Sequence, residues 1–94
     1  MKVDIKCENG RAVARLSGEI DHHTSKELRA QLDRYIITTQ PSELTIDLRN
    51  ITFMDSSGIG LIMGRSKLLR ECGGRLEVHS PQPYIRRVLR LAGM

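Results

Sequence analysis

The chain has 94 residues, a formal net charge of +4, 39% hydrophobic residues and 28% charged residues. This size allows one small domain, over residues 1–94, and the apolar fraction is typical of a globular chain rather than a disordered one. No apolar run approaches the roughly 18 residues of a membrane span, and the start lacks a signal-peptide core, so the sequence predicts a cytoplasmic domain without membrane contacts.

Two alternating segments open the chain. Residues 2–7 alternate charged and apolar side chains, and residues 11–16 alternate again, which is the period of half-buried strands. Asn9 and Gly10 lie between them and can supply the positive φ angles of a tight turn. The sequence therefore predicts a hairpin.

A helix is predicted to open at Asp21-His22-His23-Thr24 and to end before Pro41. Thr24 and Glu27 have the spacing of a capping box, and Asp21 lies at the positive end of the helix, where a carboxylate is favoured. The apolar face consists of Leu28, Leu32, Tyr35 and Ile36.

Further elements follow in the order strand, connector, helix, strand, helix: 44–48, 50–55, 56–72, 75–79, and a last helix opened by Pro81 and Pro83. The predicted inward positions of these two helices are Ile59, Ile62, Met63, Ser66, Leu69, and then Ile85, Val88, Leu89 and Ala92. The resulting order, β-β-α-β-α-β-α, indicates an α/β fold in which crossovers place parallel strands side by side.

Two cysteines, Cys7 and Cys72, lack the spacing of a zinc site, so no metal is expected. They are interpreted as small buried hydrophobes in a reducing compartment. The last third is basic, with seven Lys and Arg from Arg65 onward, and an alternative is a nucleic-acid surface that includes Arg86 and Arg87. Because the chain has only three aromatic residues and solvated helix faces explain the charges, no direct nucleic-acid contact is expected.

Asp55-Ser56-Ser57-Gly58 lies at the second helix start, where free N–H groups and the helix dipole favour an anion. One interpretation is a helix cap, with Gly58 and Gly60 allowing close packing. The other is a phosphate, either bound from a ligand or added to a serine, which would bring nearly two negative charges beside Asp55. The residues alone leave both open.

Catalysis is not expected. A nucleotide-binding loop would need a terminal Lys-Ser/Thr, and a serine hydrolase would need a GxSxG-like elbow with an Asp/His relay to Ser57. His22 and His23 are interpreted as exposed loop residues. Gly60 and Gly64, one helical turn apart, either leave a bare strip for a partner or let the helix approach the sheet.

Four segments together resemble the bacterial anti-sigma factor antagonists, the STAS domain family, and within it the antagonist of the sporulation anti-sigma factor. They are Leu16-Ser17-Gly18-Glu19-Ile20-Asp21-His22-His23-Thr24, Leu44-Thr45-Ile46-Asp47-Leu48, Phe53-Met54-Asp55-Ser56-Ser57-Gly58-Ile59-Gly60, and Gly73-Gly74. The resemblance covers nearly the whole chain in order. It implies a mixed sheet, antiparallel at its first strand, with helices packed on it.

The resemblance also implies a function without enzymatic activity or a cofactor. Such a protein binds an anti-sigma factor that is a serine kinase, displaces the sigma factor, and lets go when phosphorylated, until a serine phosphatase resets it. The phosphorylated serine maps to Ser56, and Asp21 maps to an acidic residue beside it. The expected partner-binding residues are Asp21, Asp55, Ser56, Ser57, Gly58, Ile59, Gly60 and Gly64.

Two alternatives accompany this resemblance. A related scaffold could dock a protein or anion at this helix start without being phosphorylated. The family also usually continues past the position of Met94 with another helix, so the chain represents either a shortened or a naturally short member. A missing helix would expose apolar surface and favour a dimer.

Overall fold

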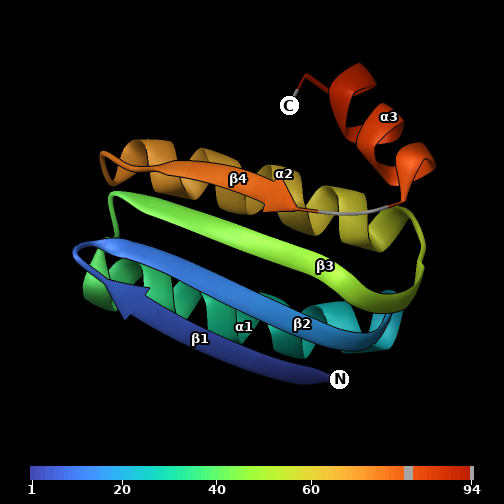
Figure 1. Ribbon diagram of the computed structural model, residues 1–94, viewed down its shortest axis with the longest axis horizontal. Coiled ribbons are helices and arrows are strands. Elements are labelled where there is room, and N and C mark those ends of the chain that lie inside the picture. Colours follow the sequence, from blue (N-terminus) through green and yellow to red (C-terminus); the bar gives the residue numbers. More distant parts are fainter. Residues whose placement is uncertain (80–81, 94) are drawn as a thin grey trace.

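The computed structural model describes residues 1–79 and 82–93. Seven elements follow one another: β1 (Lys2–Glu8), β2 (Arg11–Ile20), α1 (His22–Thr39), β3 (Glu43–Met54), α2 (Ser56–Glu71), β4 (Arg75–His79) and α3 (Pro83–Leu91) (Figure 1). The predicted order of strands and helices is confirmed. Pro83 opens α3 as expected, whereas Pro81 lies outside the described residues.

The sheet has the strand order β1-β2-β3-β4. β1 pairs antiparallel with β2, and β2-β3 and β3-β4 are parallel, so the expected mixed sheet is confirmed. Asn9 and Gly10 have φ angles of 55° and 79°. Both lie in the left-handed region that an Asn-Gly turn supplies, which fixes the register of the first two strands.

α1 and α2 cover the same face of the sheet, and Figure 1 shows both helices behind the strands. Two successive right-handed crossovers that move in one direction across a sheet place their helices on one side. The core lies between these layers, and its largest fully buried side chains are Leu16, Ile20, Leu28, Leu32, Ile36, Leu44, Ile46, Leu48, Ile62, Leu69 and Ile85.

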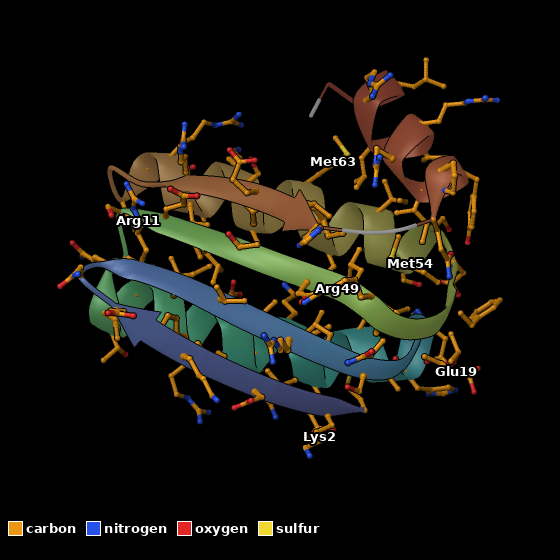
Figure 2. All side chains as sticks on the ribbon, viewed as in Figure 1. Lys2, Arg11, Glu19, Arg49, Met54 and Met63 are labelled. Carbon is orange, nitrogen blue, oxygen red and sulfur yellow. The ribbon has the colours of Figure 1, made fainter. Side chains whose placement is uncertain are left out.

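The opposite face of the sheet carries charges in register. One row runs Asp4, Arg15, Asp47 and His79 across the four strands. Asp47 is only 5% exposed, and its Oδ2 lies 2.7 Å from Nη2 of Arg49, which Figure 2 places on the side away from α1 and α2. Hydrogen bonds from the Arg49 guanidinium hold the pKa of Asp47 below its ordinary value.

β3 is longer than predicted. Residues 50–54 were expected to form a connector, but β3 continues through Met54 and pairs with the end of β2, from Ser17↔Asn50 to Ile20↔Met54. The register shifts after Arg15 and again after Gly18. These irregularities interrupt the alternation of inward and outward side chains. The alternation of apolar and polar residues in the sequence therefore stops before β3 ends.

The buried face of α2 also differs from the prediction. Met63 is 40% exposed, and the unpredicted Leu61 and Arg65 are buried. Nε of Arg65 lies 2.7 Å from Oδ1 of Asp33 on α1, an ion pair whose N–H is not aligned as a hydrogen bond. α2 therefore packs against α1 as well as against the sheet. Leu61 and Arg65 are four residues apart, so they lie on the same side of α2.

Smaller expectations have mixed outcomes. Tyr35 is half-buried and packs against the core, as expected of the apolar face of α1. Ser66 and Ala92 are only half-buried, and Val88 on α3 is 38% exposed. Cys7 is exposed and Cys72 is half-buried, so the interpretation of both as buried hydrophobes is wrong. Cys7 lies near the end of β1, an edge strand with a neighbour on one side only, and Cys72 caps the carboxyl end of α2.

Within the described part of the chain, no helix combines the length and the apolar character needed to cross a membrane.

Candidate functional site

The predicted site lies where β2 and β3 end side by side. Ile20 pairs with Met54, and each strand is followed by one aspartate and then a helix. The amide of Asp55 donates a 3.1 Å hydrogen bond to the carbonyl of Ile20. The carboxyl ends of the two parallel strands therefore bring the starts of α1 and α2 together, as is usual at the functional edge of such sheets.

Asp21 begins α1 as its N-cap. Its Oδ1 accepts hydrogen bonds of 2.9 Å from the amides of His23 and Thr24, and Thr24 Oγ1 accepts one of 2.9 Å from the amide of Asp21. The box predicted for Thr24 and Glu27 is thus wrong, because Asp21 already caps the helix three residues earlier. These hydrogen bonds, that from the Thr24 amide above all, lower the pKa of Asp21.

Asp55 begins α2 in the same way. Its Oδ1 accepts a 2.9 Å hydrogen bond from the amide of Ser57, so the cap interpretation holds for this carboxylate. Ser56, the first residue of α2, is exposed, and its hydroxyl has no hydrogen-bond partner among the described residues. The aspartate caps the helix, and the serine hydroxyl beside it stays available.

The three glycines of this helix have different surroundings. Gly58 is buried, and a Cβ there would collide with the Met54 side chain. A Cβ at Gly60 or Gly64 would have no neighbour within 4 Å. Gly58 therefore permits close packing of α2 on the strand end, and the other two leave a bare strip of helix.

A groove of about 390 Å³ runs between α1 and α2 beside this strip. It is lined by His22, Ser25, Lys26 and Arg29 from α1 and by Ser57, Gly60, Leu61, Gly64 and Arg65 from α2. Three of the predicted partner residues, Ser57, Gly60 and Gly64, line it. The basic residues of α1 were missed as site residues, although their spacing of three to four placed them on one helix face.

The remaining predicted residues do not line this groove. Asp21 and Asp55 are occupied as caps, and Ile59 is half-buried against the core. Ser56 lies directly before Ser57 at the exposed start of α2. The predicted residues therefore lie at the start of α1 and from the N-cap of α2 to Gly64, with Gly58 buried and Ser57, Gly60 and Gly64 lining the groove.

Acid–base relays are not formed here. Ser57 and His22 both line the groove, but in the described part of the chain no hydrogen bond joins them and no carboxylate bonds His22. A serine nucleophile needs both contacts. No three His, Cys, Asp or Glu side chains cluster as a metal site within residues 1–79 and 82–93.

Part of the basic last third is committed to pairs within the chain. Arg65 is buried against Asp33, and Nη2 of Arg75 lies 3.5 Å from Glu43 and 3.8 Å from Glu77. These contacts make the nucleic-acid alternative less favourable, because such a surface needs unpaired cations for phosphates.

The profile of the STAS domain matches residues 2–94. An anti-sigma F factor antagonist from Paenibacillus polymyxa is 39% identical over all of this chain and 80% of that protein. An anti-sigma-B factor antagonist from Bacillus subtilis is 28% identical over the whole chain and 84% of that protein.

Solved structures agree with these matches. The anti-sigma factor antagonist SpoIIAA in its unphosphorylated form has a TM-score of 0.82 and 31% identity, over 96% of this chain and 83% of that one. The phosphorylated form of SpoIIAA, from Bacillus, has a TM-score of 0.81 at the same identity, over 98% and 84% of the two chains. The fold described above is therefore shared with both forms.

Proposed function

The chain belongs to the STAS domain family, among its anti-sigma factor antagonists, and on this premise we propose that its unphosphorylated form binds an anti-sigma factor that is also a serine kinase. Binding displaces the sigma factor and allows transcription. The chain is then a regulatory protein and the substrate of the kinase rather than an enzyme. Because the kinase and the sigma factor act beside RNA polymerase, the proposed location is the cytoplasm.

The phosphoacceptor in this proposal is Ser56. The observation that carries the assignment is its exposed hydroxyl, without a hydrogen-bond partner in the described chain, on the first residue of α2. Phosphoryl transfer depends mainly on positioning, and the kinase supplies ATP, Mg²⁺ and the base. An accessible hydroxyl at a helix end can enter the active site of another protein without unfolding this one.

In this proposal, phosphorylation ends partner binding through a local change in charge. A phosphate on Ser56 adds nearly two negative charges beside Asp55, and the N-terminus of α2 partly stabilises them. An acidic or apolar partner surface docked there is repelled, and a serine phosphatase restores binding. The equal likeness to the two forms of SpoIIAA supports a switch that leaves the fold unchanged.

The proposed footprint on the kinase follows the surface at the two helix starts. It includes Asp21, Asp55, Ser56, Ser57, Ile59 and the bare strip at Gly60 and Gly64. Gly58 is buried, so its part is to hold α2 close to Met54.

We assign the pathway by the degree of likeness. Identity is 39% to an antagonist of an anti-sigma F factor and 28% to one of an anti-sigma-B factor. This difference in identity favours an anti-sigma F factor, and with it a role in sporulation, over an anti-sigma-B factor as the partner of this chain.

The test is the intact mass of the protein, with peptide mapping, after incubation with an anti-sigma F factor, Mg²⁺ and ATP. We expect one added phosphoryl group, on Ser56. A control incubation with an anti-sigma-B factor should react more slowly. No added mass with a folded protein and an active kinase would instead support a docking scaffold that is not phosphorylated.

A further inference from the structure

The groove between α1 and α2 is basic. Its lining includes Lys26, Arg29 and Arg65 as permanent cations. None of the lining residues is acidic. One nearby carboxylate, Asp33, contacts both arginines, at 3.9 Å from Nε of Arg29 and 2.7 Å from Nε of Arg65. With Arg65 paired to Asp33, Lys26 and Arg29 supply the positive charge of the groove. The carboxylates of Asp21 and Asp55 at the helix starts are engaged by backbone amides as caps.

Arg65 forms a fixed part of this groove. It is 6% exposed, and besides the ion pair with Asp33 its Nη1 donates a 3.3 Å hydrogen bond to the carbonyl of Leu61. Lys26 and Arg29 are exposed on the opposite wall, with two thirds of the Arg29 side chain accessible. The groove thus combines one immobilised cation with two that can reach toward a ligand.

The α2 wall offers unusual access to the backbone. Gly60 and Gly64 line the groove one turn apart, and beyond the neighbouring backbone of α2 no atom lies within 4 Å of where a Cβ would be at either position. A partner chain can therefore lie directly against the helix backbone, as it does where small residues line a helix contact. Ser57 lines the same groove at the start of α2, one residue after Ser56.

We propose that this groove binds an acidic segment of the anti-sigma kinase, with Lys26 and Arg29 as the residues that recognise its carboxylates. The inference rests on the proposed function and adds the chemistry of the partner segment. Charge complementarity carries it, because opposed charges select the partner and speed its association. The bare strip of α2 provides the room in which that segment lies.

This arrangement also gives the phosphate a second effect. Ser56 directly precedes Ser57 of the groove lining, so a phosphoryl group on Ser56 brings negative charge that can compete with the partner carboxylates for Lys26 and Arg29. Phosphorylation then ejects the acidic segment by competition as well as by repulsion.

The first experiment compares two charge reversals of equal size. Lys26→Glu/Arg29→Glu changes the groove, and Arg34→Glu/Lys67→Glu changes two exposed residues of the same helices that do not line it. Affinity for an anti-sigma F factor loaded with Mg²⁺ and ADP is measured by calorimetry. At low salt, we expect the affinity of the groove variant to be lower than that of wild type by about tenfold or more. The affinity of the control variant should stay within about twofold of the wild-type value. The difference should shrink as ionic strength rises.

A second experiment locates the carboxylates. Carbodiimide condenses a lysine amine with a contacting carboxylate into an amide, so the bound complex should cross-link through Lys26 and not through Lys67. Lys26→Arg keeps the charge and should keep the affinity while losing that cross-link. A Lys26 cross-link mapped to an Asp or Glu of the kinase identifies the segment.

The outcomes separate the two proposals. If both reversed variants bind equally, or if Lys26 forms no cross-link in the complex, the groove inference is overturned, while phosphorylation of Ser56 by the same kinase leaves the proposed function standing. If the wild-type protein neither binds nor is phosphorylated, both are overturned. Unchanged melting temperatures confirm that the variants are folded.

Discussion

The amide of Asp55 donates a 3.1 Å hydrogen bond to the carbonyl of Ile20, so the last residue of β2 holds the N-cap of α2. The next residue after Ile20 is Asp21, the N-cap of α1. One hydrogen bond therefore ties together the two capped helix starts. A partner that docks on both meets a preorganised surface, which reduces the ordering cost of association.

Ser56→Asp should weaken binding of the anti-sigma kinase. The carboxylate places a negative charge beside Asp55, and a loss of about 3 kcal/mol corresponds to roughly a hundredfold weaker affinity. Titration calorimetry measures the effect, and thermal unfolding checks that the fold persists. Undiminished binding with an intact melting temperature would count against charge repulsion.

Ser56→Ala should bind the kinase but resist release by ATP, because it cannot accept a phosphoryl group. Size-exclusion chromatography of the complex, before and after adding Mg²⁺ and ATP, shows whether release occurs. Ser57→Ala is the matched control, since its neighbouring hydroxyl has no hydrogen-bond partner in the described chain either. Release of the Ser56→Ala protein in ATP would move the acceptor to another residue.

Gly58→Ala should destabilise the protein by about 1–3 kcal/mol, because the added methyl group collides with the Met54 side chain. Gly60→Ala is the control in the same helix. Its methyl group meets no atom within 4 Å, so helix propensity should stabilise the free protein by up to about 1 kcal/mol. Urea unfolding measures both, and equal effects at the two positions would contradict the difference in packing.

If the bare strip contacts the kinase, Gly60→Ala should weaken binding several-fold even though it stabilises the free protein. An affinity equal to wild type would place the contact elsewhere on the surface.

Asp47 should make stability depend on acid pH. Arg49 lowers the pKa of this carboxyl in the folded state, so its stabilisation is present above the ordinary carboxyl pKa. It is lost as pH falls through the lowered value. Asp47→Asn should cost about 1–2 kcal/mol at neutral pH, the scale of a hydrogen bond to a charged group. The difference in the free energy of unfolding between this variant and wild type should become smaller as pH falls from about 5 to about 2.

Urea unfolding across this range measures the narrowing. Asp4→Asn is the control, because Asp4 is exposed and forms no ion pair in the described chain. If the difference in stability between wild type and Asp47→Asn stays constant down to acid pH, Asp47 does not stabilise the fold through its charge.

Sequence patterns predicted the elements whose signals are local. The Asn9-Gly10 turn, the alternation of residues 11–16 and the start of α2 at Ser56 all lie as predicted. Each depends on backbone preferences or side-chain periodicity within a few residues. The capped start of α2 was predicted in the same way, since Asp55 and Ser56 have the composition of a helix start, whereas the choice of Ser56 as phosphoacceptor came from the family resemblance.

Other features required contacts between distant segments. β3 extends through Met54 because β2 supplies partners across two register shifts, and Arg65 is buried because Asp33 of α1 neutralises it. Cys7 is exposed because its strand lies at the sheet edge. Alternation and helical spacing describe one segment at a time, so they do not report what packs against it.

The sequence by itself determined the order of strands and helices, the mixed sheet, and a serine at a capped helix start, because local preferences and the quoted motifs specify these. Only the tertiary structure decided that Gly58 packs inward while Gly60 and Gly64 face a groove, and that basic residues of α1 form its other wall. The physical reason is that two helices from separate crossovers meet there. Their contact brings the charges of α1 beside Gly60 and Gly64, while the packing of α2 on Met54 and Ile20 buries Gly58.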